Sequence, residues 1–143
     1  MTKIERVPEW QRDLLLWGDR QRRRKWHWGE TDCGTLMRKG LELVFGHPLM
    51  SIDYASREEA QAWMQDMGTS ASKYFEGCGA SRQARNDVQG GDVIVRPGTV
   101  NGMPRLAFAL DDEVLLSSDP VQGPHWIGTK DLRRRARLYR FAP

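Results

Sequence analysis

The hydrophobic pattern of this chain changes its period once, at Gly90-Gly91, and that change limits the folds available to it. Before it, apolar residues recur at helical spacing; after it, short apolar runs are separated by glycine, proline or paired aspartates. Helices followed by antiparallel strands indicate the α+β class. A chain of 143 residues is long enough for one hydrophobic core. We therefore predict a single domain over residues 1–143, mainly helical in 1–89 and mainly strand in 90–143.

The local signals place the individual elements. Helices are expected over residues 8–24 and 35–45, then in a third segment that Ser56 caps and Gly68 ends, with one more turn over 71–75. Residues 77–86 are expected to form a loop or a short helix. Strands are expected over 92–96, 105–110, 113–117 and 125–128, and a final strand at 137–141, with Leu132, closes the sheet. The second and third strands form a hairpin, so the helices pack on a small antiparallel sheet.

The stretch WHWGETDCG, residues 26–34, leads directly into the second helix. Cys33 is therefore placed at or just before a helix N-terminus, where free backbone N–H groups and the helix dipole favour a thiolate. One interpretation is a catalytic nucleophile, and the other is a small buried hydrophobic residue. Asp32 has two interpretations as well, a contact to a substrate amine or the N-cap of the helix.

These residues resemble a known family. The pattern Trp-Gly-x-x-Asp-Cys-Gly at a helix start, followed by a strand opening Gly-Gly-Asp-Val at residues 90–93, is similar to the NlpC/P60 cysteine peptidases. It looks most like their divergent relatives from phage and prophage tail operons, over residues 10–141. The resemblance implies a papain-like α+β fold. It also implies cleavage of peptidoglycan stem peptides in active members, and a place at the tail tip or baseplate hub.

The chain departs from that family at the catalytic base. The family histidine begins the strand after the Gly-Asp strand, and the matching stretch here is RLAFAL, residues 105–110, with Leu106 in the histidine position, or Arg105 if the register shifts by one. The orienting residue would fall at 116–118, which holds no histidine. A general base contributes roughly two to four powers of ten in rate. His125 and, less readily, His27 are the alternative bases; otherwise each is a partly buried histidine bonded to backbone.

Two functions follow from this resemblance. The first is a structural component of a phage tail tip or baseplate hub, a pseudoenzyme made in the bacterial host cytoplasm and assembled into the virion tail. Its expected partners are other tail-tip, hub or tape-measure proteins. The alternative is an active cysteine peptidase that uses Cys33 with His125 and cuts peptidoglycan so that the tail crosses the cell wall.

Positive charge is clustered although the net charge is only +3. The two blocks, at residues 20–25 and 133–137, are either solvated surface or docking patches for an acidic partner. A nucleic-acid-binding module is a third hypothesis, but it rests on these arginines alone, so no specific nucleic-acid binding is expected. The expected interface residues are Trp26, Trp28, Arg22, Arg23, Arg24, Arg133, Arg134 and Arg135.

The remaining composition excludes several other classes. Two cysteines and three scattered histidines lack zinc-ligand spacing, so no metal and no cofactor is expected. Free thiols at Cys33 and Cys78 are expected rather than a disulfide. No apolar run is long enough to span a bilayer, and the N-terminus lacks the apolar core of a signal peptide.

Overall fold

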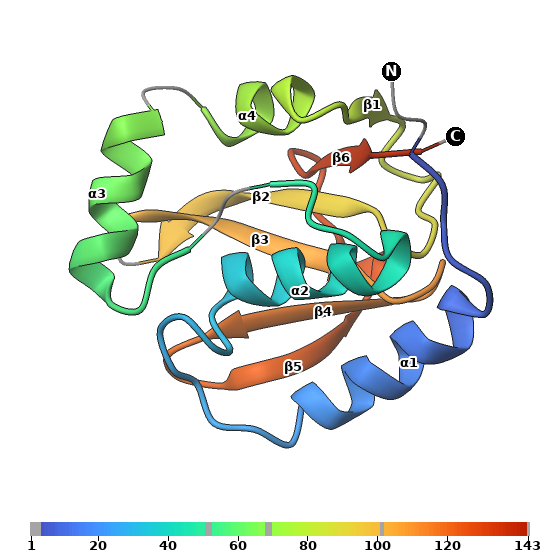
Figure 1. The fold of residues 1–143 in the computed structure, drawn as a ribbon, viewed down its shortest axis with the longest axis horizontal. Helices are drawn as coiled ribbons and strands as arrows, with labels where there is room; N and C mark the ends of the chain where they lie inside the picture. The colour runs from blue at the N-terminus through green and yellow to red at the C-terminus, as the bar shows by residue number, and fades with distance from the viewer. Residues whose placement is uncertain (1–3, 51–52, 68–69, 101, 143) are drawn as a thin grey trace.

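The computed structural model describes residues 4–50, 53–67, 70–100 and 102–142, and these residues form four α-helices and one six-stranded sheet (Figure 1). The prediction of an α+β fold with N-terminal helices is confirmed. The elements are α1 (Trp10–Gln21), α2 (Cys33–Phe45), α3 (Arg57–Met67), α4 (Ala71–Gly77), β1 (Ser81–Gln83), β2 (Val93–Val100), β3 (Met103–Ala109), β4 (Val114–Asp119), β5 (Gly123–Gly128), a 3₁₀ turn (Thr129–Asp131) and β6 (Arg137–Arg140). No helix in the described part of the chain combines the length and apolar character needed to cross a membrane.

The sheet has the order β1-β6-β2-β3-β4-β5, and every neighbouring pair is antiparallel. The predicted hairpin of β3 and β4 is confirmed. The prediction that the last strand closes the sheet is wrong, because β6 lies inside it and β1 forms the edge. β1 falls in the segment predicted as loop or short helix; its three residues carry no apolar pattern, and it is a strand because it pairs with β6. Leu132 follows the 3₁₀ turn and lies outside β6.

The two faces of the sheet are both covered. We call the face under α1 and α2 the helix face (Figure 1). It carries Leu106, Phe108 and Leu116 into the main core. The opposite face, here the back face, carries Ala107 and Leu115 into a smaller core that the connections around Val88, Leu132 and Ala136 cover. Successive residues of a strand alternate between faces, so this assignment fixes where each strand side chain points.

The helix ends follow their local chemistry. α1 is shorter than the predicted 8–24, because Glu9 adopts a left-handed conformation (φ 60°) just before it and the basic block after Gln21 has no apolar residues to bury. α2 begins at Cys33, two residues earlier than predicted, and ends at Gly46 (φ 77°). The Ser56 cap of α3 is confirmed by the bond from the Glu59 backbone N–H to its Oγ (3.1 Å).

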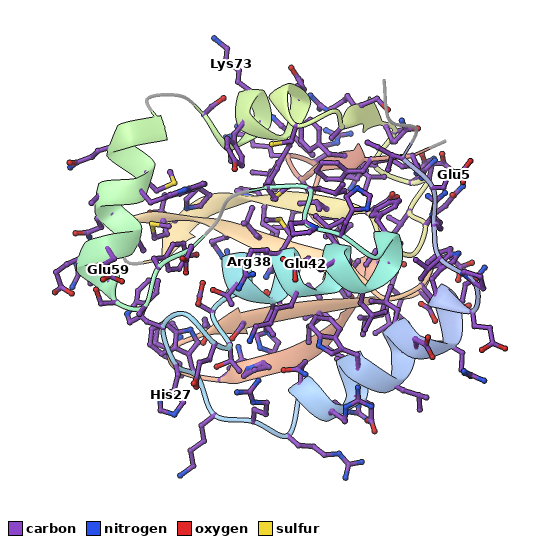
Figure 2. The ribbon with its side chains drawn as sticks, viewed as in Figure 1. Glu5, His27, Arg38, Glu42, Glu59 and Lys73 are labelled. Atoms are coloured by element: carbon purple, nitrogen blue, oxygen red, sulfur yellow. The ribbon has the colours of Figure 1, made fainter. Side chains whose placement is uncertain are left out.

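α2 is the helix that positions the site. Its outer side carries the Arg38–Glu42 ion pair (3.2 Å), as the amphipathic pattern predicts (Figure 2). Its inner side approaches β3 closely at Gly40, where an added Cβ would collide with the ring of Phe108. This close approach holds the N-terminus of α2 against the start of β3.

Candidate functional site

Cys33 is the first residue of α2 and lies against β3. Its Sγ–H donates to the carbonyl of Pro104 at 3.8 Å, and the residue is half-buried. Cys78 is also a free thiol, half-buried at the end of α4. The structure therefore brings the predicted nucleophile to β3, the strand on which the resemblance led us to expect a catalytic base.

Asp32 is buried and caps α2. Its Oδ1 accepts from the backbone N–H of Gly29 (2.8 Å) and the hydroxyl of Thr35 (2.7 Å). Its Oδ2 accepts from the Thr35 backbone N–H (3.2 Å) and from the hydroxyl of Tyr54 (2.7 Å). Gly34 has no side chain, which leaves room for the Tyr54 hydroxyl. The bond from the Thr35 backbone N–H is the N-cap of α2, and the other three bonds hold the carboxylate against the preceding loop, the Thr35 hydroxyl and Tyr54.

The thiol of Cys33 is not activated. Burial raises its pKa to about 11, and the negative charge of Asp32 adds to that rise; the backbone N–H of Leu106 is the largest opposing influence. The expectation of a stabilised thiolate at this helix N-terminus is therefore wrong. The physical reason is that burial disfavours the anion by more than the nearby N–H groups favour it, and that an aspartate already occupies the helix N-terminus.

Leu106 faces Cys33 from β3. The side chain lies on the helix face and is buried, in register with Val95 of β2. Ser118 continues the helix-face row of β4, and its Oγ is buried without a hydrogen-bond partner among the described residues. Ser118 belongs to residues 116–118, where the resemblance led us to expect the residue that orients the base.

The three histidines, all within the described residues, lie away from the thiol. His125 shares its register position with Ser117 and points, like Ile127, to the back face, where its Nδ1–H donates to the carbonyl of Gly123 (2.8 Å). His27 is exposed in the loop after α1 (Figure 2). His47 follows α2 and bonds to the carbonyl of Phe45 (3.0 Å). The structure does not bring any of them into the hollow beside Cys33.

The hollow beside Cys33 has a volume of about 800 Å³ when the space open to solvent is included. Aromatic side chains form much of its wall. Trp26 packs edge-to-face on Trp28 with ring centroids 4.8 Å apart, and Trp63 packs in the same way on Tyr74 at 5.2 Å. Tyr54 connects the two pairs, with its ring centroid 6.1 Å from Trp28 and 6.4 Å from Trp63. The two tryptophans that the sequence suggested for an interface are thus walls of this hollow.

Three arginines of the first basic block contact carboxylates just outside the block. Arg22 and Arg23 both contact Asp19 (2.6 and 3.2 Å), and the guanidinium of Arg22 also stacks on Trp126 at 3.9 Å. Arg24 bonds to Gln21 (3.1 Å) and lies 3.8 Å from Glu30. These contacts give the block a local structural role; they do not test its predicted role in docking.

The second basic block lies on the opposite side of the sheet from the hollow beside Cys33, which we call the first hollow. Arg133, Arg134 and Arg135 are all exposed, and Arg133 also lines a second hollow on the back face together with Arg96 and Arg105. Sequence reasoning missed Arg96 and Arg105. The two arginines flank a short segment that contains Gly98 and Gly102. These glycines are the turn signal that could have paired the arginines across a hairpin.

The described residues hold no group of three or more His, Cys, Asp or Glu side chains suited to a metal ion. Residues 5–139 match a family described as a domain of unknown function, DUF6950, and that match includes both hollows. No curated protein matches the chain.

Proposed function

The chain belongs to the DUF6950 family, and because the function of that family is unknown, we propose one from the geometry at Cys33. The protein is a non-hydrolytic structural component of a phage tail tip or baseplate hub, built on a papain-like, NlpC/P60-like scaffold whose catalytic site is degenerate. The phage setting, the host cytoplasm as its place of synthesis and the tail proteins as its partners come from the resemblance described above.

The observation that supports the loss of catalysis is the contact of Cys33 with β3. A cysteine peptidase needs an imidazole beside the thiol to take its proton. Here the facing side chain is Leu106, which has no titratable group, and no histidine lines the hollow. With a pKa of about 11, roughly one thiol in ten thousand is ionised at pH 7.

The remaining parts of the site are those of a rigid scaffold. The N-cap of α2, the four hydrogen bonds to Asp32 and the aromatic wall are all retained without a base. Such a hollow is suited to holding a segment of a neighbouring protein, because aromatic residues are enriched at the centres of protein interfaces.

A hydrolysis assay tests the loss of catalysis. Wild-type protein and the Cys33→Ala variant are incubated with a peptidoglycan stem peptide, and we expect neither to release product above the buffer rate. Iodoacetamide is also applied at pH 6 to the Cys78→Ser variant, in which Cys33 is the one remaining thiol. We expect Cys33 to stay unmodified. Cleavage by the wild type that Cys33→Ala abolishes would establish the active peptidase instead.

The tail assignment has its own test. Particles purified after induction of a prophage that encodes this chain should contain the protein in the tail fraction, as detected by mass spectrometry. A protein that stays entirely in the host lysate, with intact particles free of it, would contradict the structural role whatever the hydrolysis assay shows.

A further inference from the structure

Two arginines stand directly opposite each other on neighbouring strands. Arg96 of β2 and Arg105 of β3 are register partners, and both are half-buried. Like charges at directly opposed positions of an antiparallel pair destabilise a sheet. The alternation of β2 and β3 directs both side chains to the back face, since Ile94 and Ala107, two residues away along their strands, lie in the back-face core.

Arg133 adds a third positive charge to the same hollow. The hollow measures about 490 Å³, open solvent included, and its remaining wall is Pro97, Leu132 and Ala136. The pKa of Arg96 lies below its ordinary value, first because of burial and then because of the positive charges of Arg105 and Arg133. Arg105 and Arg133 are therefore both close enough to repel the guanidinium of Arg96, and all three side chains line the same hollow.

The charges are not neutralised from within the described chain. No described carboxylate lies within ion-pair distance of Arg96, Arg105 or Arg133. Asp119 exerts the strongest attraction on Arg96, but its Oδ1 accepts from the backbone N–H groups of Val121 and Gln122 (2.9 and 2.7 Å) and so holds the turn after β4.

We propose that Arg96, Arg105 and Arg133 form a binding site for a single phosphate group. Guanidinium groups match the oxygens of a phosphate with pairs of parallel hydrogen bonds, and three of them suit a dianion better than a monocarboxylate. Such an anion would relieve the repulsion between the two strand arginines. This hollow lies on the back face and does not include Cys33, although Arg96 and Arg105 also line the hollow beside Cys33.

Calorimetric titration of the whole protein with inorganic phosphate, in a buffer of low chloride, tests the site. We expect saturable binding of phosphate, weaker binding of acetate, and at least about a tenfold loss of phosphate affinity in the double variant Arg96→Gln/Arg105→Gln. The matched control is Arg134→Gln, an exposed arginine of the same block outside the hollow, which should bind phosphate like the wild type.

The folded state of each variant is checked by thermal unfolding without phosphate. The double variant should unfold at the same temperature as the wild type or higher, because it removes the opposed charges. If it fails to fold, Arg133→Gln, which changes only an exposed connection, takes its place with the same expected loss. Equal phosphate affinity in the wild type and the site variants, or phosphate binding no tighter than acetate binding, would overturn the site.

A short DNA duplex as a second probe distinguishes the source of the phosphate. Loss of DNA binding in the double variant but not in Arg134→Gln supports this site as a seat for a polynucleotide phosphate. An equal loss in both variants, with phosphate binding lost only in the double variant, supports the site as a seat for a small phosphorylated molecule.

Discussion

Asp32 and Asp92 are both buried aspartates, yet the structure stabilises them in opposite ways. Asp92 is fully buried and receives two bonds from one cation: Nε of Arg140 donates to its Oδ1 and Nη2 of Arg140 donates to its Oδ2, both at 2.9 Å. Asp32, 3% exposed, receives only neutral donors at the N-terminus of α2. The charge pair at Asp92 joins β6 to the start of β2. At Asp32, neutral dipoles alone organise the loop before α2.

The difference bears on which region can host chemistry. A carboxylate held by a cation is locked, because separating the pair leaves a buried charge. A carboxylate held by hydroxyl and backbone groups keeps its negative charge unneutralised, and at Asp32 that charge helps to raise the pKa of the neighbouring thiol. Asp32 is thus one physical reason that the pKa of the Cys33 thiol is raised.

The largest effect is expected from breaking the charge pair. Arg140→Met leaves Asp92 buried without its cation, and we expect the free energy of unfolding to fall by about 3–5 kcal/mol. Urea denaturation measures it, with Arg12→Met as the control, since Arg12 pairs with Glu9 on the exposed surface and should cost at most about 1 kcal/mol. Similar losses in the two variants would remove the distinction between the charge pair and an ordinary surface pair.

A smaller effect is expected at Asp32, which only neutral groups hold. Asp32→Ala removes the cap of α2 and leaves the hydroxyl of Tyr54 without its acceptor, so we expect a loss of about 2–3 kcal/mol by the same urea measurement. Adding Tyr54→Phe to Asp32→Ala should recover part of that loss, since the orphaned hydroxyl is then absent. A loss larger than that of Arg140→Met would show that the dipoles contribute more than the cation does.

The smallest effect is a dependence of stability on pH. The pKa of Cys33 is about 11 in the folded protein and 9.0 in its reference state. A raised pKa means that the folded protein holds the proton more tightly, so the stabilisation is complete below pH 9 and is lost as the pH rises towards 11. Relative to Cys33→Ala, the wild type should lose about 1 kcal/mol of unfolding free energy between pH 8 and pH 10. A constant difference over that range would indicate an ordinary thiol pKa.

Local chemistry made much of this fold predictable. α2 carried a cap at Asp32, an apolar face and a terminal Gly46, and each of these signals lies within a few residues of the feature that it specifies. The hairpin of β3 and β4 was predictable for the same reason, because Asp111 accepts from the backbone N–H groups of Glu113 and Val114 and so forms the turn (2.8 Å each).

Features created by distant pairing were not predictable. Nothing in the exposed Ser81–Gln83 segment indicates a strand, and the insertion of β6 beside β2 depends on contacts about 45 residues apart in the sequence. At the site, the position of Leu106 facing Cys33 followed from a motif. The raised thiol pKa did not, because the sequence does not show the burial that causes it. The opposition of Arg96 and Arg105 required the register of β2 on β3.

The interior position of β6 makes two features of the molecule depend on the same strand. Before residues 137–140 have docked, β2 has an unpaired edge and β1 has no partner strand, so a chain still emerging from the ribosome exposes a bare edge beside Val93 and Val95. Arg140 arrives with the same strand, so until then Asp92 lacks its cation as well. Completion of the sheet and neutralisation of Asp92 are therefore coupled, because both depend on β6.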